Sequence, residues 1–221
     1  KKEAVRFPFG FGLSYTTFHH ELITFDPDKK HMNINVKVKN TGHFAGKDVV
    51  QVYVRQPQGH LGKPEKVLVS FAKTGVLKPG ESEVLSLSFD EYDFASYDET
   101  GLTGHPSSYV LEAGNYVIEL AHDVSTSWHE LNYTINQTKV IETLEEVLRP
   151  VKTFKRIKPK FVNGHTQIVH EEVPRRTVDL LAKIDQYRPK TLKAPDHFVS
   201  LRDVYEKRSE EHTSELQSRQ S

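Results

Sequence analysis

The sequence predicts an all-β fold in which antiparallel sheets pack face to face. Hydrophobic residues alternate with polar ones at a period of two through most of residues 18–138. Gly- and Pro-containing turn signals separate these runs at the short intervals expected between strands. With 221 residues, 36% of them hydrophobic, the chain is long enough to bury a modest core.

The first clear strand is HMNINVKVKN, residues 31–40. It places Met32, Ile34, Val36 and Val38 on one face and polar side chains on the other. This alternation is typical of a half-buried strand at the surface of a core.

The next run, residues 47–55, reads KDVVQVYVR and carries apolar residues on both faces. It is therefore expected to be a central strand. The Gly- and Pro-rich residues 56–64 then form a loop, and strand-like sequence resumes over residues 65–77.

A tight turn follows at residues 78–82, where Pro79 and Gly80 stand in the order that suits a type II turn. Residues 83–89 alternate again, with the larger apolar side chains on one face: Leu85, Leu87 and Phe89. This stretch is predicted to be another half-buried strand.

Two more strands complete the pattern. A turn at Gly114 precedes a strand over residues 116–121, and residues 129–138 supply a last one. Several short strands at this spacing indicate a sandwich of the immunoglobulin or fibronectin type III kind, with a closed barrel as the alternative.

The charges and the cysteine count exclude several classes of protein. Thirty basic and thirty acidic residues cancel, so there is no basic excess of the kind that binds nucleic acid. No apolar run approaches the ~20 residues needed to cross a bilayer, so neither nucleic acid nor a membrane is an expected partner. The chain has no cysteine, hence no disulfide or thiolate metal site, which fits a reducing compartment.

The acidic segment DEYDFASYDET, residues 90–100, could be a carboxylate pair or a calcium loop. Its spacing matches no EF-hand, so a structural loop is the stronger interpretation. Phe94 and Tyr97 are expected to face the core, and Tyr97 is the candidate for a corner tyrosine that hydrogen-bonds back to the backbone.

The histidines do not indicate a metal site. His19 and His20 are adjacent and should point to opposite faces of a strand, and His122 and His129 are seven residues apart without a partner cluster. No metal or cofactor is predicted. The single tryptophan, Trp128, is expected to pack at a domain boundary rather than to stack on a sugar.

Aromatic residues crowd the segment RFPFGFGLSYTTF, residues 6–18. Exposed apolar surface of this kind needs a cover. Phe7, Phe9, Phe11 and Tyr15 are therefore predicted to pack against another domain, or to form the rim of an active site built by other domains.

The pattern changes after about residue 139. Residues 142–150 and 173–189 are predicted to form short helices that end at prolines, and a basic linker-like run lies between them. The second segment has an apolar stripe at helical spacing: Leu180, Leu181, Ile184 and Tyr187.

The last segment, residues 208–221, is predicted to be a processing artefact. Its first eleven residues, RSEEHTSELQS, are identical to the in-frame translation of a common sequencing-library adapter. We therefore exclude it from the interpretation of the fold.

Several motifs, taken together, resemble the fibronectin type III-like domain of glycoside hydrolase family 3. They occur in that family's order across residues 6–121: FPFGFGLSYTTF, VKVKNTGHFAGKDVVQVYVRQP, GVLKPGESEVLSLSF, DFASYD and EAGNYVIELA. The segment LRDVYEK, residues 201–207, is similar to the sequence that leads into the catalytic barrel in the circularly permuted members of the family.

The resemblance implies a domain organisation. Residues 1–15 would be the end of a preceding α/β sandwich domain, residues 16–138 the β-sandwich, and residues 139–207 an extended linker with short helices that leads to the catalytic barrel. These two neighbouring domains are the implied partners.

The resemblance also implies an activity for the whole enzyme, a retaining β-glycosidase of the β-glucosidase type acting on β-linked oligosaccharides or glycosides. Such enzymes use two carboxyl groups, which the family places in the barrel and the α/β sandwich domain. No catalytic residue is therefore expected in this chain, whose role would be scaffolding. The alternative is a free-standing module that binds a carbohydrate or a protein and has no enzyme activity.

Overall fold

The computed structural model of the chain divides into two compact units, residues 1–177 and residues 178–221, and each is described by itself. The description covers residues 5–28, 31–145, 152–163, 165–173, 180–188 and 202.

The first sheet of the larger unit contains three antiparallel strands in the order β1-β2-β5: β1 (Phe18–Pro27), β2 (His31–Asn40) and β5 (Ser82–Asp90). The predicted alternation along β2 is confirmed, because Met32, Ile34, Val36 and Val38 are all fully buried. Along β5 the alternation is also as predicted.

The second sheet contains four antiparallel strands in the order β4-β3-β8-β9: β4 (Lys66–Lys73), β3 (Val49–Arg55), β8 (Gly114–Asp123) and β9 (Thr126–Ile135). β3 lies between β4 and β8, so its prediction as a central strand is confirmed.

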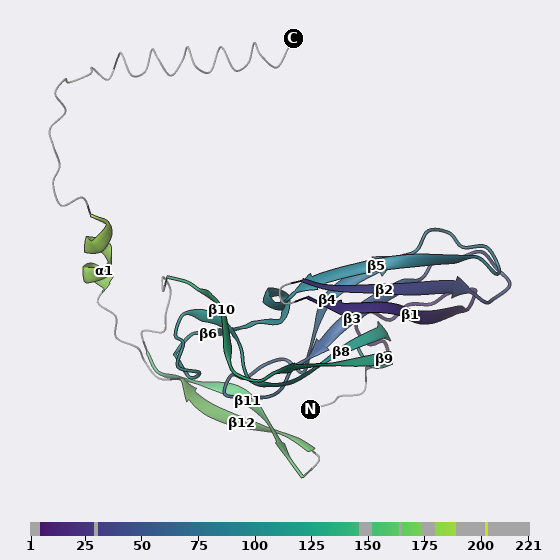
Figure 1. Ribbon diagram of the computed structural model, residues 1–221. Helices are drawn as coiled ribbons and strands as arrows, with labels where there is room; N and C mark the ends of the chain where they lie inside the picture. The colour runs from purple at the N-terminus through teal and green to yellow at the C-terminus, as the bar shows by residue number, and fades with distance from the viewer. Residues whose placement is uncertain are drawn as a thin grey trace. The chain divides into compact units, whose positions relative to one another are not determined.

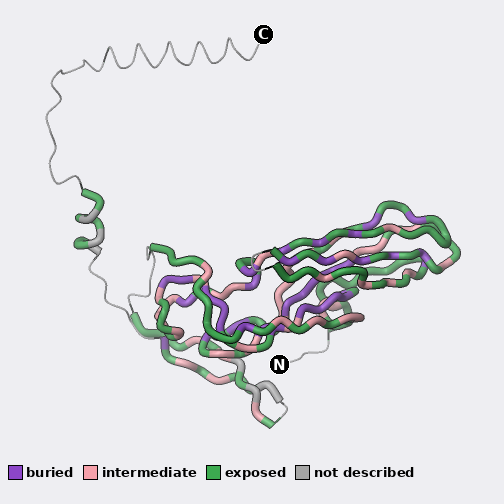
Figure 2. The backbone as a smooth tube through the Cα atoms, viewed as in Figure 1, coloured by how far each residue is buried: buried purple, intermediate pink, exposed green. Residues whose placement is uncertain are grey.

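The two sheets enclose one hydrophobic core, to which both contribute (Figure 1). Buried and exposed positions alternate along β2 and β5 of the first sheet (Figure 2), whereas the interior positions of β3 in the second sheet are all buried. The sheets are open and end in edge strands, so the fold is a sandwich and the closed barrel is wrong. The turn before β5 is also as predicted: Gly80 has φ +84° and the Glu81 amide donates to the Lys78 carbonyl over 3.0 Å.

A third, smaller sheet was not predicted. It has the order β10-β7-β6: β10 (Lys139–Thr143), β7 (Ser108–Leu111) and β6 (Ser96–Asp98). The 3-10 turn η1 (Glu91–Phe94) connects it to β5, and Phe94 is buried in the core as predicted.

The first short helix predicted in the C-terminal extension, over residues 142–150, is not supported. Glu142 and Thr143, at the start of the first predicted helix, lie in β10, and residues 146–150 lie outside the described residues. The β-branched run from Val140 to Thr143 pairs with the open edge of β7, and this tertiary pairing overrides the local helical pattern.

The basic run predicted as a linker is also a strand. β11 (Phe154–Val162) pairs with β12 (His165–Val173) in an antiparallel hairpin. Lys158 Nζ donates to the His60 carbonyl over 2.7 Å, so the hairpin is tied to the loop before β4. The described part of the extension is therefore mainly β-structure.

In the second unit the described element is α1 (Leu180–Tyr187), an eight-residue helix. Three members of the predicted apolar stripe, Leu181, Ile184 and Tyr187, are exposed. No helix among the described residues is long and apolar enough to cross a membrane.

Candidate functional site

The aromatic strip, residues 7–15, presents its rings outward. Phe7, Phe9 and Phe11 are 62%, 66% and 42% exposed, and Tyr15 is 97% exposed. The rings of Phe7 and Phe11 lie 5.2 Å apart between centroids. The structure thus brings these two predicted site residues into contact and leaves a continuous apolar surface open.

The backbone of the strip, in contrast, is firmly attached to the second sheet. The Val124 amide, in the turn between β8 and β9, donates to the Phe9 carbonyl over 3.0 Å. Gln51 Nε2, on β3, donates to the Gly10 carbonyl over 2.9 Å. Two consecutive carbonyls of the strip are therefore held by the sandwich.

The position of Gly10 requires glycine. Its φ is +83°, and a Cβ there would lie 2.1 Å from Gln51 Oε1 and 2.9 Å from the Tyr53 hydroxyl. Gln51 is itself fixed, because Tyr53 donates to its Oε1 over 2.6 Å and its Nε2 donates to the His122 carbonyl over 2.6 Å. The side chain that holds the Gly10 carbonyl is thus itself fixed in position by the second sheet.

Two grooves flank the strip. The first is largely apolar, about 720 Å³ in volume, and its walls include Phe9, Phe11, Leu68 and Phe71. The second, about 880 Å³, combines Phe7 and Phe9 with charged side chains: Arg55, Glu65, Lys66, Glu119 and Glu130.

Two carboxylates of the second groove, Glu119 and Glu130, are paired with cations. Glu119 is buried and contacts both Arg55, at 2.9 Å, and Lys66. Arg55 also lies 3.5 Å from the exposed Glu130. Glu119 and Glu130 thus each have a cation beside them, an arrangement that stabilises the structure and leaves neither of these two carboxylates positioned as a free acid or base.

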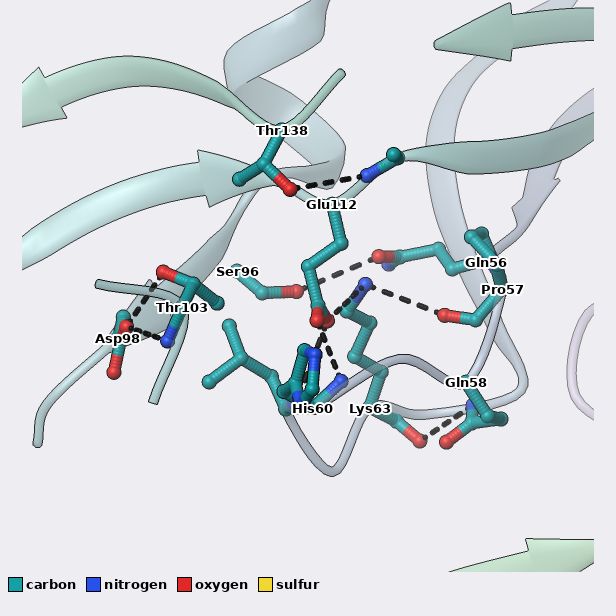
Figure 3. Close-up of polar contacts among 12 residues, drawn as sticks. Gln56, Pro57, Gln58, His60, Lys63, Ser96, Asp98, Thr103, Glu112 and Thr138 are labelled. Atoms are coloured by element: carbon teal, nitrogen blue, oxygen red, sulfur yellow. Dashed lines mark hydrogen bonds and ion pairs between the residues drawn. The ribbon is translucent and has the colours of Figure 1, made fainter. Parts of the chain in front are cut away.

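The loop before β4 is fixed by a buried ion pair, shown in Figure 3. Lys63 Nζ lies 2.8 Å from Glu112 Oε2, and both side chains are fully buried. The amides of His60 and Leu61 donate to the same carboxylate over 2.5 and 3.2 Å. Burial alone would raise the pKa of Glu112, but Lys63 and these amides outweigh it and hold that pKa below its usual value.

The corner tyrosine is Tyr116, not Tyr97 as predicted. The Tyr116 hydroxyl donates to the Glu112 carbonyl, four residues upstream, over 3.0 Å, and its ring is fully buried. Tyr97 points outward from β6 and is 39% exposed. The signal that could have identified Tyr116 is its place two residues after Gly114, at the beginning of a strongly apolar strand.

The acidic segment is structural, as predicted. The Asp98 carboxylate accepts hydrogen bonds from the amides of Gly101, Leu102 and Thr103 and from the Thr103 hydroxyl, over 2.6–3.0 Å. Burial opposes ionisation of Asp98, but these four donors lower its pKa below the usual value. In the part of the chain that the structure describes, no group of three His, Asp or Glu residues could hold a metal ion.

A histidine cluster that sequence reasoning missed joins the two large sheets. His20 Nε2 lies 2.5 Å from Asp48 Oδ2, and the His20 ring stacks on Trp128 at 5.3 Å and meets His122 at 4.7 Å. The partners of His122 are thus a second histidine and, through it, a tryptophan, and the described residues around it do not include a group that could hold a metal ion. Burial, and then the neighbouring His20, lower the pKa of His122.

Comparison with known proteins identifies this arrangement. A family described as "Fibronectin type III-like domain" matches residues 48–124. A β-glucosidase of Ruminococcus albus is 42% identical over 204 residues, which are 92% of this chain and 21% of that protein. The crystal structure of a β-glucosidase from Paenibacillus barengoltzii superposes with a TM-score of 0.77 at 39% identity, covering 90% of this chain and 23% of that one.

The chain belongs to the fibronectin type III-like domains of family 3 β-glucosidases. β-Glucosidase A of Butyrivibrio fibrisolvens supports the same assignment, at 36% identity over 209 residues and 87% of this chain. The chain spans between a fifth and a quarter of the length of these relatives. It therefore corresponds to an accessory domain of a glycosidase.

Proposed function

We propose that this fibronectin type III-like domain holds together the catalytic domains of a retaining β-glycosidase, which hydrolyses β-linked oligosaccharides or glycosides. Its partners are the α/β sandwich domain and the barrel of the same enzyme, and the two catalytic carboxyl groups belong to them. The chain supplies position rather than a reacting group.

The observation that carries this proposal is the aromatic strip. Its carbonyls are fixed by Gln51 and Val124, while Phe7, Phe9 and Phe11 remain open. A surface whose backbone is already ordered loses less conformational entropy when it is covered. The strip is therefore suited to pack against a neighbouring domain, with Tyr15 at its far end, or to form the rim of that domain's active site.

The proposal also covers the segment after the sandwich, residues 139–207, as the connection to a barrel that follows in the permuted order. The match to the Ruminococcus albus enzyme supports a link between this segment and the same enzyme, because it covers 92% of this chain and so extends beyond the sandwich. Precise connection matters, since a displacement of ~1 Å at a catalytic centre can cost about a hundredfold in rate.

Grafting tests the proposal. Residues 1–207 would replace the matching region of the Ruminococcus albus β-glucosidase, and hydrolysis of an aryl β-glucoside would be measured. We expect the graft to retain activity within about tenfold of the parent, and the isolated chain to have none. Replacing Phe7, Phe9 and Phe11 together by alanine should lower kcat about 10- to 100-fold.

The matched control is Phe44→Ala, which removes an aromatic ring that is 64% exposed on a loop outside the strip. It should leave kcat unchanged. Hydrolysis by the isolated chain, or full activity of the graft without the three rings, would contradict the scaffolding role.

A further inference from the structure

The third sheet carries a second exposed aromatic surface, here called the tyrosine row: Tyr92, Tyr97 and Tyr109 with Glu142. In the sheet register Tyr97 on β6 is opposite Tyr109 on β7, which is opposite Glu142 on β10. Paired residues of neighbouring strands point to the same side of a sheet. The three side chains therefore form a line across one face.

The tyrosine row lies on the outer face of this sheet. Val110 and Ser108, on either side of Tyr109 along β7, are buried, so the opposite face is covered by the protein. Tyr92, from η1, is 45% exposed and Tyr97 is 39% exposed. The sequence gives no sign of this surface, because it depends on the unpredicted pairing of β6, β7 and β10.

The rings are in mutual contact. The centroids of Tyr92 and Tyr109 are 4.8 Å apart and those of Tyr97 and Tyr109 are 5.4 Å apart, with interplanar angles of 49° and 55°. Each ring is held by its neighbour, so little side-chain entropy remains to be lost when a ligand covers them.

The polar groups of the row suit a neutral, polyhydroxylated ligand. Phenol hydroxyls both donate and accept hydrogen bonds, and the Glu142 carboxylate accepts. Partial burial, a hydrogen bond with Tyr109 and the charge of Glu142 raise the pKa of Tyr92 further above neutral pH, where a phenol is already protonated. The lysine of β10, Lys139, is paired with Glu91, so it is not available to attract an anionic ligand.

We propose that the tyrosine row binds a β-linked neutral glycan, with pyranose rings lying on Tyr92, Tyr97 and Tyr109 and hydroxyl groups bonded to Glu142. Equatorial substituents leave the two faces of such pyranose rings apolar, and aromatic rings cover apolar faces well. The choice of ligand class rests on the proposed function in a β-glycosidase. The row would hold a polymeric substrate beside the enzyme, independently of the aromatic strip.

Titration of the chain with cellotetraose tests this surface, with maltotetraose as the α-linked control. We expect saturable binding of cellotetraose, observed by calorimetry and by amide chemical-shift changes in β6 and β7. Tyr97→Ala should weaken it about tenfold or more, and Tyr97→Phe, which keeps the ring, by no more than about threefold. Phe44→Ala should have no effect, and thermal unfolding of each variant verifies that it is folded.

The inference is overturned if cellotetraose does not saturate the chain by about 10 mM, if maltotetraose binds as tightly, or if Tyr97→Ala binds like the parent. Saturable binding of a proline-rich decapeptide at these tyrosines in place of cellotetraose would also overturn it, in favour of a peptide-binding groove. The grafting experiment is assayed with an aryl β-glucoside, a small substrate that does not need to contact the tyrosine row. An active graft with no glycan binding would therefore reject the tyrosine row alone and retain the scaffolding role.

Discussion

The buried carboxylates of this domain are occupied by partners within the chain, whereas the rings of the aromatic strip and the tyrosine row are left exposed. Glu112 is bound by Lys63 and two amides, and Asp98 by four donors of its own loop. Phe9 and Tyr97, in contrast, have rings that the described residues leave open by 66% and 39%.

This difference distinguishes the residues that stabilise the sandwich from those that are suited to contact a partner. A carboxylate whose oxygens are filled by internal donors keeps a low pKa and stays ionised, so it is poorly suited to carry a proton in catalysis. Exposed rings on a fixed backbone do little for the stability of the sandwich, but they are suited to be covered by a partner. The predictions below test each side of this comparison.

The largest loss in the free energy of unfolding is expected for Glu112→Gln. This change preserves shape but leaves Lys63 buried without its counter-charge, and breaking such a pair costs about 3–5 kcal/mol. Urea unfolding of the chain at pH 7 measures the free energy. A loss below about 1 kcal/mol would show that the ion pair is not what fixes the loop before β4.

A smaller, pH-dependent loss in the free energy of unfolding is expected for Asp98→Asn. The amide nitrogen of asparagine cannot accept the loop hydrogen bonds, so unfolding at pH 7 should be easier by about 2 kcal/mol. The pKa of Asp98 lies below its usual value of 3.8. Its contribution is therefore complete above that pH and lost as the pH falls through the folded-state pKa.

Unfolding curves at pH 7 and in increasingly acidic buffer compare the two proteins. The difference between parent and Asp98→Asn should shrink below pH 3.8. A difference that stays constant with pH would mean that packing, rather than the ionised carboxylate, holds this loop.

Gly10→Ala should weaken the attachment of the aromatic strip to the second sheet. The added Cβ would collide with Gln51, and the positive φ disfavours alanine, at a local cost of about 1–2 kcal/mol. We expect faster hydrogen exchange of the Val124 amide, which donates to Phe9, with little change in exchange within the core strands.

Gly12→Ala is the matched control, because nothing lies within 4 Å of a Cβ at that position. Its Val124 amide should exchange at the parent rate. Equal exchange rates of the Val124 amide in Gly10→Ala and Gly12→Ala would mean that the contact at Gly10 does not hold the strip on the sheet.

Much of the sandwich could be predicted from sequence because its strands alternate strictly. Met32, Ile34, Val36 and Val38 are fully buried, as the period of two requires. The exposure of Phe7 could also be predicted, because it belongs to a crowded aromatic segment that precedes the first alternating strand.

The remaining features depend on pairings between distant residues. β10 formed because β7 offered an open edge 30 residues earlier, and nothing local to Glu142 indicates this. The attachment of the strip depends on Gln51 on β3, and no local pattern predicts that its side chain would reach the Gly10 carbonyl. Tyr116 was missed in favour of Tyr97, although its place two residues after Gly114 could have indicated it.

The central claim, that this domain contributes position and no reacting group, is tested most directly by the pH dependence of kcat/KM in the grafted enzyme. Glu130→Gln is the informative variant. Glu130 is an exposed carboxylate of the second groove, 3.5 Å from Arg55, and it is the member of that cluster most accessible to a substrate. Replacing an exposed partner of this kind costs at most about 1 kcal/mol of stability.

The account predicts that both limbs of the pH profile stay at the same pH in the parent graft and in Glu130→Gln. Loss of one limb in the variant, with the folded state intact, would show that a carboxylate of this chain takes part in proton transfer. That result would contradict the scaffolding role.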